Sequence, residues 1–286
     1  LFLASAWATC HDYFVRWANW PNLPLVMDVW KWRAAEAILD APADETLLVT
    51  IPDGLEPAIS YALHARTASP ARDFDGARCL IYPTQISNRT RYVAILGYEH
   101  RSLTRLQELF PVGYQTTDPM FHEDAPYFAS FTIPAGTQVP VLGRLPAPVI
   151  YQDIVLHGVH TSPATVSAGQ AVTVTLTWEI LRPTSANYTA FVHVLDGRPE
   201  AAEAPLKAQH DSLPCDAAEP TWHWRPDEYI LDEHRLTVPS NLRAGEYLLG
   251  VGLYDADTLQ RLPPDGEDVH TQWGEAIVGS ISVIAQ

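Results

Sequence analysis

The sequence has few basic residues, and this shortage excludes a class of partner. Lysine and arginine number 18 against 34 aspartates and glutamates, which gives a formal net charge of −16 over 286 residues. A surface of this kind repels phosphate backbones and anionic lipid headgroups. We therefore expect no nucleic-acid partner, and a neutral ligand or a cation fits the charge better.

Cysteine is also scarce. Cys10, Cys79 and Cys215 lie far apart and form no Cys-x-x-Cys pair. An odd, sparse set argues against a disulfide scaffold and against a structural zinc site. We expect no metal and no cofactor, while the redox state of the cysteines stays open.

Long apolar runs are missing as well, since none reaches the roughly 18 residues that a membrane-spanning helix needs. The chain nevertheless starts with the apolar stretch Leu1–Ala8, without an initiator methionine or the charged region of a signal peptide. We expect the natural protein to continue upstream. The stretch is then either the outer end of a membrane segment or the end of an ordinary buried strand or helix.

Helix and strand patterns alternate through the first half of the chain. The predicted helices are Asp28–Ala41, Glu56–Arg66 and Ser102–Phe110, and the predicted strands are Thr46–Ile51, Arg78–Pro83, Arg91–Tyr98 and Tyr127–Ile133. A turn is predicted at Pro52–Gly54, and Asp28 is the expected helix cap. Alternation of this kind predicts an α/β domain with a largely parallel sheet, which we assign to residues 1–138. Residues 139–147, rich in proline and glycine, are the predicted linker.

Helix patterns disappear from residues 148–286. In Ala171–Ile180, apolar side chains alternate with threonines, so Trp178 is predicted to lie on the core face. Four more strands are predicted at Asn187–Gly197, Glu228–Val238, Gly245–Asp255 and Glu275–Ile284. The predicted fold class is an α+β multidomain protein, in which an N-terminal α/β layered domain is followed by an all-β sandwich domain.

Short catalytic motifs are absent: there is no Gly-x-Ser-x-Gly elbow, no phosphate-binding glycine loop and no His-Glu-x-x-His helix. Asp255-Ala256-Asp257 matches the Asp-x-Asp pattern of metal-dependent sugar transferases, but it follows a strand directly. We interpret it as a hairpin turn, where aspartate is favoured for backbone reasons. No catalytic residue is assigned.

Histidines suggest a metal site that we do not favour. His210 and Asp211 fall in the same irregular region as His223, which raises the possibility of a calcium or zinc site. Solvated or hydrogen-bonded histidines are the preferred interpretation. His193, inside a predicted strand, is assigned a structural role.

The candidate ligand-binding residues are Trp222, His223, Trp224 and Asp211. Two tryptophans around a histidine provide two rings for stacking on a sugar, provided that both rings are exposed and rigid. The favoured alternative is that the rings anchor the loop to its own domain by burial. We predict that at least one ring is buried, Trp222 before Trp224 because it adjoins Pro220, and that His223 faces solvent.

The second half resembles the C-terminal region of bacterial membrane glycosyltransferases of family 39, especially those of Chloroflexi-type bacteria. The resemblance covers most of residues 150–265, through the segments Val166–Gly197, Ala208–Pro214, Pro220–Asp255 and Gln260–Pro263. Arg225-Pro226-Asp227-Glu228 replaces the Pro-Gly-Glu of the family pattern. Asp12–Ala18 also resembles the segment that follows the last membrane helix in such proteins.

The resemblance implies a non-catalytic, soluble extracytoplasmic region of a membrane transferase that uses polyprenyl-phosphate sugar donors. Family 39 proteins resemble protein O-mannosyltransferases, whose catalytic acid lies in an early extracytoplasmic loop, and no residue here matches that motif. The implied partners are an upstream transmembrane domain of the same chain and a glycan or acceptor, at the outer face of the bacterial cell membrane. Two alternatives stay open: a stand-alone carbohydrate-binding protein, and a hydrolase with an acid pair between its domains.

Overall fold

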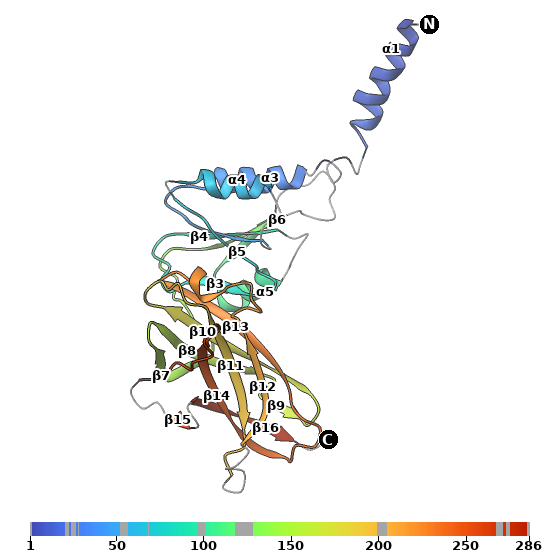
Figure 1. Cartoon of the computed structure of the whole chain (residues 1–286). Coiled ribbons are helices and arrows are strands. Elements are labelled where there is room, and N and C mark those ends of the chain that lie inside the picture. The colour runs from blue at the N-terminus through green and yellow to red at the C-terminus, as the bar shows by residue number, and fades with distance from the viewer. Residues whose placement is uncertain are drawn as a thin grey trace. The chain divides into compact units, whose positions relative to one another are not determined.

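The chain folds into two compact units that are rich in β-structure (Figure 1). A computed structural model describes residues 2–20, 23, 27, 29–51, 57–67, 69–95, 101–117, 128–198, 205–266, 271–272 and 275–284. The first unit comprises Leu1–Asp73 and Ser87–Gly136, and the second comprises Phe74–Ile86 and Thr137–Gln286. Each unit is therefore built from two separate stretches of sequence.

The N-terminal residues form a helix whose side chains are exposed. α1 (Phe2–His11) and the π-helical turn η1 (Asp12–Trp17) bury no residue, and Phe2, Trp7 and Phe14 are among their exposed apolar side chains. This stretch is an exposed helix within the described chain. Within the described part of the chain, every helix is too short or too polar to cross a bilayer.

The first unit contains a mixed five-stranded sheet. Its strand order is β2 (Arg72–Phe74), β1 (Thr46–Thr50), β4 (Thr90–Ile95), β6 (Phe128–Ile133) and β5 (Tyr114–Thr117). β1 and β4 run parallel, but β6 is antiparallel to both β4 and β5. The expected largely parallel sheet is thus wrong, because β5 and β6 pair without the helical crossover that a parallel pair requires.

Two helices pack side by side on one face of this sheet, α3 (Val29–Leu39) and α4 (Pro57–Ala65), whereas α5 (Arg101–Leu109) lies across the sheet from them (Figure 1). The three predicted helices are confirmed. Ile38 and Ile59 pack with Val93 in one apolar cluster, so burial of one helical face fixes each helix on the sheet. The predicted cap Asp28 and turn Pro52–Gly54 lie outside the described residues.

The second unit contains two further sheets, named here after their central strands. The β10 sheet has the order β3 (Leu80–Pro83), β13 (Glu228–Thr237), β10 (Ala171–Ile180), β8 (Ile154–Ser162) and β7 (Arg144–Tyr151). The β11 sheet has the order β12 (Leu206–Ser212), β11 (Tyr188–Leu195), β14 (Gly245–Asp255), β16 (Glu275–Ile284) and β15 (Thr271–Gln272), and β9 (Thr165–Ser167) pairs with β16. The five strands predicted for this half are confirmed.

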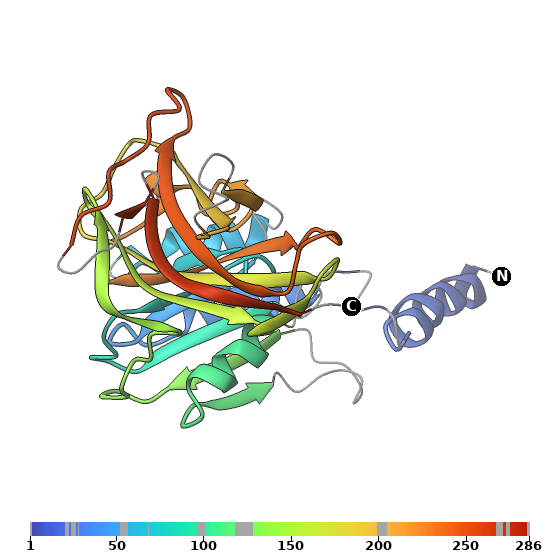
Figure 2. The same cartoon turned by 90° about the horizontal axis from the view of Figure 1, so that it is seen from below.

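Side chains that point between the two sheets form the core of the second unit. Figure 2 shows its strands curving around a common interior. The Tyr151 hydroxyl of the β10 sheet donates a hydrogen bond to the Val251 carbonyl of the β11 sheet at 2.8 Å. Trp178 is fully buried beside Tyr151 and Trp224, which confirms its predicted place in the core.

Two predicted boundaries differ from the structure. The strand predicted at Arg78–Pro83 belongs to the β10 sheet, where β3 pairs antiparallel with β13. β7 starts at Arg144, so the last residues of the expected linker are strand. β3 forms because of a partner that is distant in sequence, and local patterns do not show such a pairing. β7 pairs with the next strand, β8, and this hairpin extends back into the proline-rich segment.

A disulfide joins β3 to the rest of the second unit. Cys79 and Cys215 are bonded, with their Cα atoms 5.3 Å apart and a sequence separation of 136. The sequence argued against a disulfide scaffold, but one bridge is present, and Cys10 is the free, exposed cysteine. Spacing alone did not show the pair because the two cysteines meet only through the pairing of β3 with β13.

Candidate functional site

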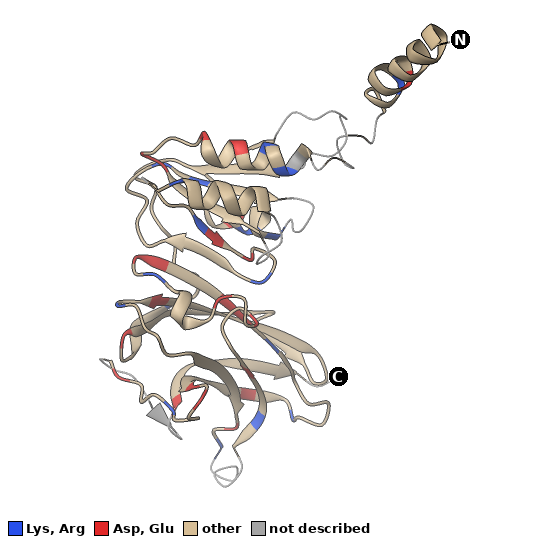
Figure 3. Cartoon of the chain, turned by 45° about the horizontal axis from the view of Figure 1, so that its top comes forward, with Lys and Arg blue, Asp and Glu red and all other residues tan. Residues whose placement is uncertain are grey.

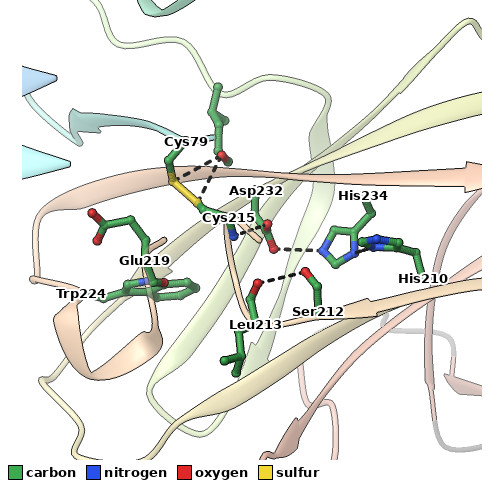
Figure 4. Close-up of polar contacts among 10 residues, drawn as sticks. Cys79, His210, Ser212, Leu213, Cys215, Glu219, Trp224, Asp232 and His234 are labelled. Carbon is green, nitrogen blue, oxygen red and sulfur yellow. Dashed lines mark hydrogen bonds and ion pairs between the residues drawn. A yellow bond between two sulfur atoms is a disulfide. The ribbon is translucent and has the colours of Figure 1, made fainter. Parts of the chain in front are cut away.

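The loop between β12 and β13, residues 213–227, carries the predicted Trp-His-Trp sequence and is fixed at several points. Cys215 lies in the disulfide, and its backbone N–H donates to Asp232 Oδ1 at 2.7 Å (Figure 4). Cys215, Asp216 and Ala217 have positive φ angles of 57°, 53° and 66°. Non-glycine residues adopt this conformation at a cost of about 1–2 kcal/mol each, so the surrounding contacts must hold the backbone there.

The second half of the loop is a single 3₁₀ turn, η3 (Thr221–His223). Thr221 is fully buried; its hydroxyl donates to the Ala186 carbonyl at 2.7 Å and accepts the Tyr188 N–H at 3.0 Å. The Trp224 indole N–H donates to the Glu219 carbonyl at 2.8 Å. These bonds hold the turn at both ends.

The turn separates the two tryptophans. Trp224 is 2% exposed and contacts Trp178 in the core, whereas Trp222 is 56% exposed. Burial of at least one ring is confirmed, but the expected order is reversed. The order was predicted from the position of Trp222 beside Pro220 at the loop entry. The 3₁₀ turn instead places Trp222 outward and leaves Trp224 to pack in the core.

His223 lies beside the exposed ring. The centroids of the Trp222 and His223 rings are 5.4 Å apart, and His223 Nδ1 lies 3.2 Å from Glu219 Oε2. The Glu219 side chain is almost wholly buried while His223 is about one-third exposed. His223 thus faces solvent in part, as predicted, and a buried carboxylate orients its ring. No sequence signal marked Glu219.

Asp211 does not join this pair. It lies on β12, where His210 and Asp211 point to opposite faces of the strand. Asp211 Oδ1 is 3.9 Å from Nε2 of His193, which itself contacts Glu275 at 2.6 Å through Nδ1. The β11 sheet therefore separates Asp211 from His210, which sequence reasoning had grouped in one irregular region.

His210 points between the sheets into a chain of three polar side chains (Figure 4). His210 Nδ1 lies 3.0 Å from His234 Nδ1, and His234 Nε2 lies 2.9 Å from Asp232 Oδ2. His234 and Asp232 are fully buried. Because the carboxylate accepts, His234 donates from Nε2; in the neutral His234 ring, Nδ1 then accepts the N–H of His210. The sequence does contain a signal for the Asp232–His234 pair: two polar residues stand at alternate positions on the apolar face of β13.

Acid should destabilise the second unit through His210. Burial, followed by repulsion from His234, lowers the pKa of His210 below its ordinary value, although Asp232, Asp211 and Asp216 oppose the shift. The unfolded chain therefore binds the proton more tightly than the folded one, so stability falls as the pH drops below about 6.5 and is unaffected by this group above it.

Thermal melts of the wild type and of His210→Gln between pH 8 and pH 5 measure this effect. The melting temperature of the wild type should fall more steeply over the acid half of that range than that of the variant. Parallel curves for the two proteins would show that His210 does not carry the effect.

Charge and the Asp-x-Asp sequence add no second site. Figure 3 shows acidic residues distributed over both units. Asp255 Oδ1 accepts the backbone N–H groups of Asp257 and Thr258 at 3.0 and 2.8 Å, which confirms the hairpin-turn interpretation. These bonds lower the pKa of Asp255. Among the described residues, no three His, Cys, Asp or Glu side chains gather as metal ligands.

No family model matches the chain, and a search of curated proteins finds no match. Among solved structures, the C-terminal domain of wzt is similar at 13% sequence identity and a TM-score of 0.34, over 51% of this chain and 82% of that one. A cellulose-active polysaccharide monooxygenase from M. thermophila is similar at 12% identity and a TM-score of 0.20, over 43% and 53%. Likenesses this low carry no argument about function, which has to come from the site itself.

Proposed function

We propose that this chain is a non-catalytic extracytoplasmic region of a bacterial membrane glycosyltransferase with a polyprenyl-phosphate sugar donor, and that it contacts glycan or acceptor through Trp222. An α/β layered domain stands nearest the bilayer in this proposal, and a β-sandwich follows it. The upstream transmembrane domain of the same chain is the first partner.

The exposed ring of Trp222 is the observation that carries the glycan contact. A sugar presents a flat C–H face, and an aromatic ring that is both exposed and rigid loses little entropy when it stacks on that face. Trp222 meets both conditions, because the turn that displays it is hydrogen-bonded through Thr221 and closed by buried Trp224. His223 beside it adds a polar group for a hydroxyl.

Two further features support an extracytoplasmic place next to a membrane. The Cys79–Cys215 disulfide is typical of proteins in oxidising compartments. α1 and η1 expose aromatic side chains, including Trp7, Tyr13 and Trp17, and tryptophan and tyrosine are enriched where a protein meets the bilayer–water interface.

Trp222→Ala should weaken glycan binding while leaving the fold intact. We expect binding to neutral oligosaccharides on a glycan array to weaken at least tenfold, as for loss of a central aromatic contact. The free energy of unfolding should change by no more than about 0.5 kcal/mol, because the ring is mostly exposed. The matched control is Trp32→Ala on α3, which removes another exposed tryptophan and should leave binding unchanged.

Glycan binding that survives in Trp222→Ala, or that Trp32→Ala weakens equally, would remove Trp222 from the proposal. The sequence encoded upstream of Leu1 separates the proposal from its first alternative. A series of about ten apolar membrane helices there supports the transferase region, whereas a secretion signal supports a stand-alone carbohydrate-binding protein with the same Trp222 site.

A further inference from the structure

A row of polar and aromatic side chains crosses the outer face of the β10 sheet, which is the face turned away from the β11 sheet. Strand pairing places Tyr82 of β3 opposite Tyr229 of β13, and Tyr229 opposite Glu179 of β10. His157 of β8 follows, with its Nε2 2.6 Å from Glu179 Oε2. Each neighbouring pair in the row is in contact or in register, so four strands contribute to one line of side chains.

A β-bulge brings His157 into this row. Thr177 of β10 pairs with Gly158, but Trp178 pairs with Leu156, so His157 is the extra residue on β8. Its ring packs edge-on against Tyr229 at 5.2 Å, and Tyr229 packs edge-on against Tyr82 at 5.6 Å. Bulges that re-aim a side chain are over-represented next to functional sites.

Three polar atoms in the row make no hydrogen bond within the described residues: the Tyr229 hydroxyl, Glu179 Oε1 and His157 Nδ1. None of the three is among the fully buried unpaired atoms of the described chain, so each is open to solvent. The groups are nevertheless largely buried, since Tyr229 is 9% exposed and the side chains of Glu179 and His157 are 16% and 19% exposed. The side chains are thus held in place by burial while these three polar atoms are hydrated and free to exchange water for a ligand. A ligand that reaches this face from solvent can supply their partners.

The chemistry of the three groups defines the ligand. Burial and the nearby Glu179 raise the pKa of Tyr229, so its phenol stays protonated and donates a hydrogen bond. The Glu179 carboxylate accepts, and in the neutral ring that donates Nε2–H to Glu179 the Nδ1 atom of His157 also accepts. One donor beside two acceptors matches adjacent hydroxyl groups, each of which can donate and accept.

We propose that Tyr229, Glu179 and His157 form a second binding site for the hydroxyl groups of a saccharide ring, on the outer face of the β10 sheet. The site is distinct from Trp222 and does not depend on it. Arg144, exposed on β7, lies near enough for its charge to act on both tyrosines and places a further donor beside the site.

Tyr82 provides the matched comparison. The Tyr82 hydroxyl donates a hydrogen bond to the Pro140 carbonyl at 3.2 Å, so it contributes to the fold. The Tyr229 hydroxyl makes no hydrogen bond within the described residues. Tyr229→Phe and Tyr82→Phe each remove one oxygen atom from neighbouring residues of the same row. A difference between the two variants therefore reports what the Tyr229 hydroxyl does.

The experiment is a titration with neutral oligosaccharides of glucose, galactose and mannose, followed by saturation-transfer NMR, on the wild type, Tyr229→Phe, Tyr82→Phe and Trp222→Ala. Loss of one hydrogen bond should raise the dissociation constant of Tyr229→Phe about 5–10-fold with no change in melting temperature. Tyr82→Phe should melt earlier and keep its affinity within about twofold.

The outcomes separate this site from the proposed function. Binding that Tyr229→Phe weakens and Tyr82→Phe does not supports the second site, whether or not Trp222→Ala weakens binding as well. Binding that depends on Trp222 but not on Tyr229 overturns the second site and leaves the proposed function standing. If the wild type binds none of these oligosaccharides, both are overturned.

Discussion

Trp178→Ala should lower the free energy of unfolding of the second unit by about 3–5 kcal/mol, the range for emptying a large aromatic site in a core. The indole is fully buried between the two sheets and touches the rings of Tyr151 and Trp224. Its removal leaves a cavity that rigid strands on both sides cannot close. Urea unfolding followed by circular dichroism gives the value.

Trp178→Phe is the control for that variant. The Trp178 indole N–H is buried and has no hydrogen-bond partner among the described residues. Phenylalanine keeps most of the apolar volume and removes the unpaired donor, so its cost should be clearly smaller than that of alanine. A loss below about 1 kcal/mol for Trp178→Ala would show that the indole is not in the core.

Removing the Cys79–Cys215 bridge should cost about 2–5 kcal/mol, because the two cysteines are 136 positions apart in sequence and the bond constrains a long loop of the unfolded chain. Both cysteines are buried, and β3 holds to β13 through only four residue pairs. The double variant Cys79→Ala/Cys215→Ala should therefore unfold at a lower urea concentration than the wild type.

Cys10→Ser is the matched control, since Cys10 is exposed and unpaired and its replacement should leave stability unchanged. Alkylation of the denatured protein provides an independent check. Oxidised wild type should present one reactive thiol, and all three cysteines of the chain should react after reduction. Three reactive thiols without a reductant would contradict the bridge.

Features encoded in consecutive residues could be predicted from the sequence. Alternation along Ala171–Ile180 placed Trp178 on the buried face because a strand has a period of two. Asp255 was correctly placed in a turn because its side chain bonds to the backbone only two and three residues further on. In such cases the interacting groups lie within a few residues of one another.

Features that depend on distant partners could not be predicted. β3 looks like any short buried strand, and nothing near Leu80 indicates that its partner is β13. Trp222 is exposed and Trp224 buried, the reverse of the predicted order, because Thr221 is hydrogen-bonded to Ala186 and Tyr188 and the loop forms a 3₁₀ turn. His157 reaches Glu179 only because of a bulge that pairing with β10 creates.

The placement of β3 also determines when the second unit can fold during synthesis. Phe74–Ile86 is synthesised early, but the rest of its unit follows much later. The disulfide from Cys79 cannot form until Cys215, 136 positions further on, has been made. At about 5–20 residues per second, the ribosome needs roughly 7–30 s to cover that distance. Throughout this interval Leu80, Ile81 and Tyr82, which are fully buried in the finished fold, have no sheet to join. The nascent chain thus carries an apolar strand without its partner, open to aggregation, until β13 has been made.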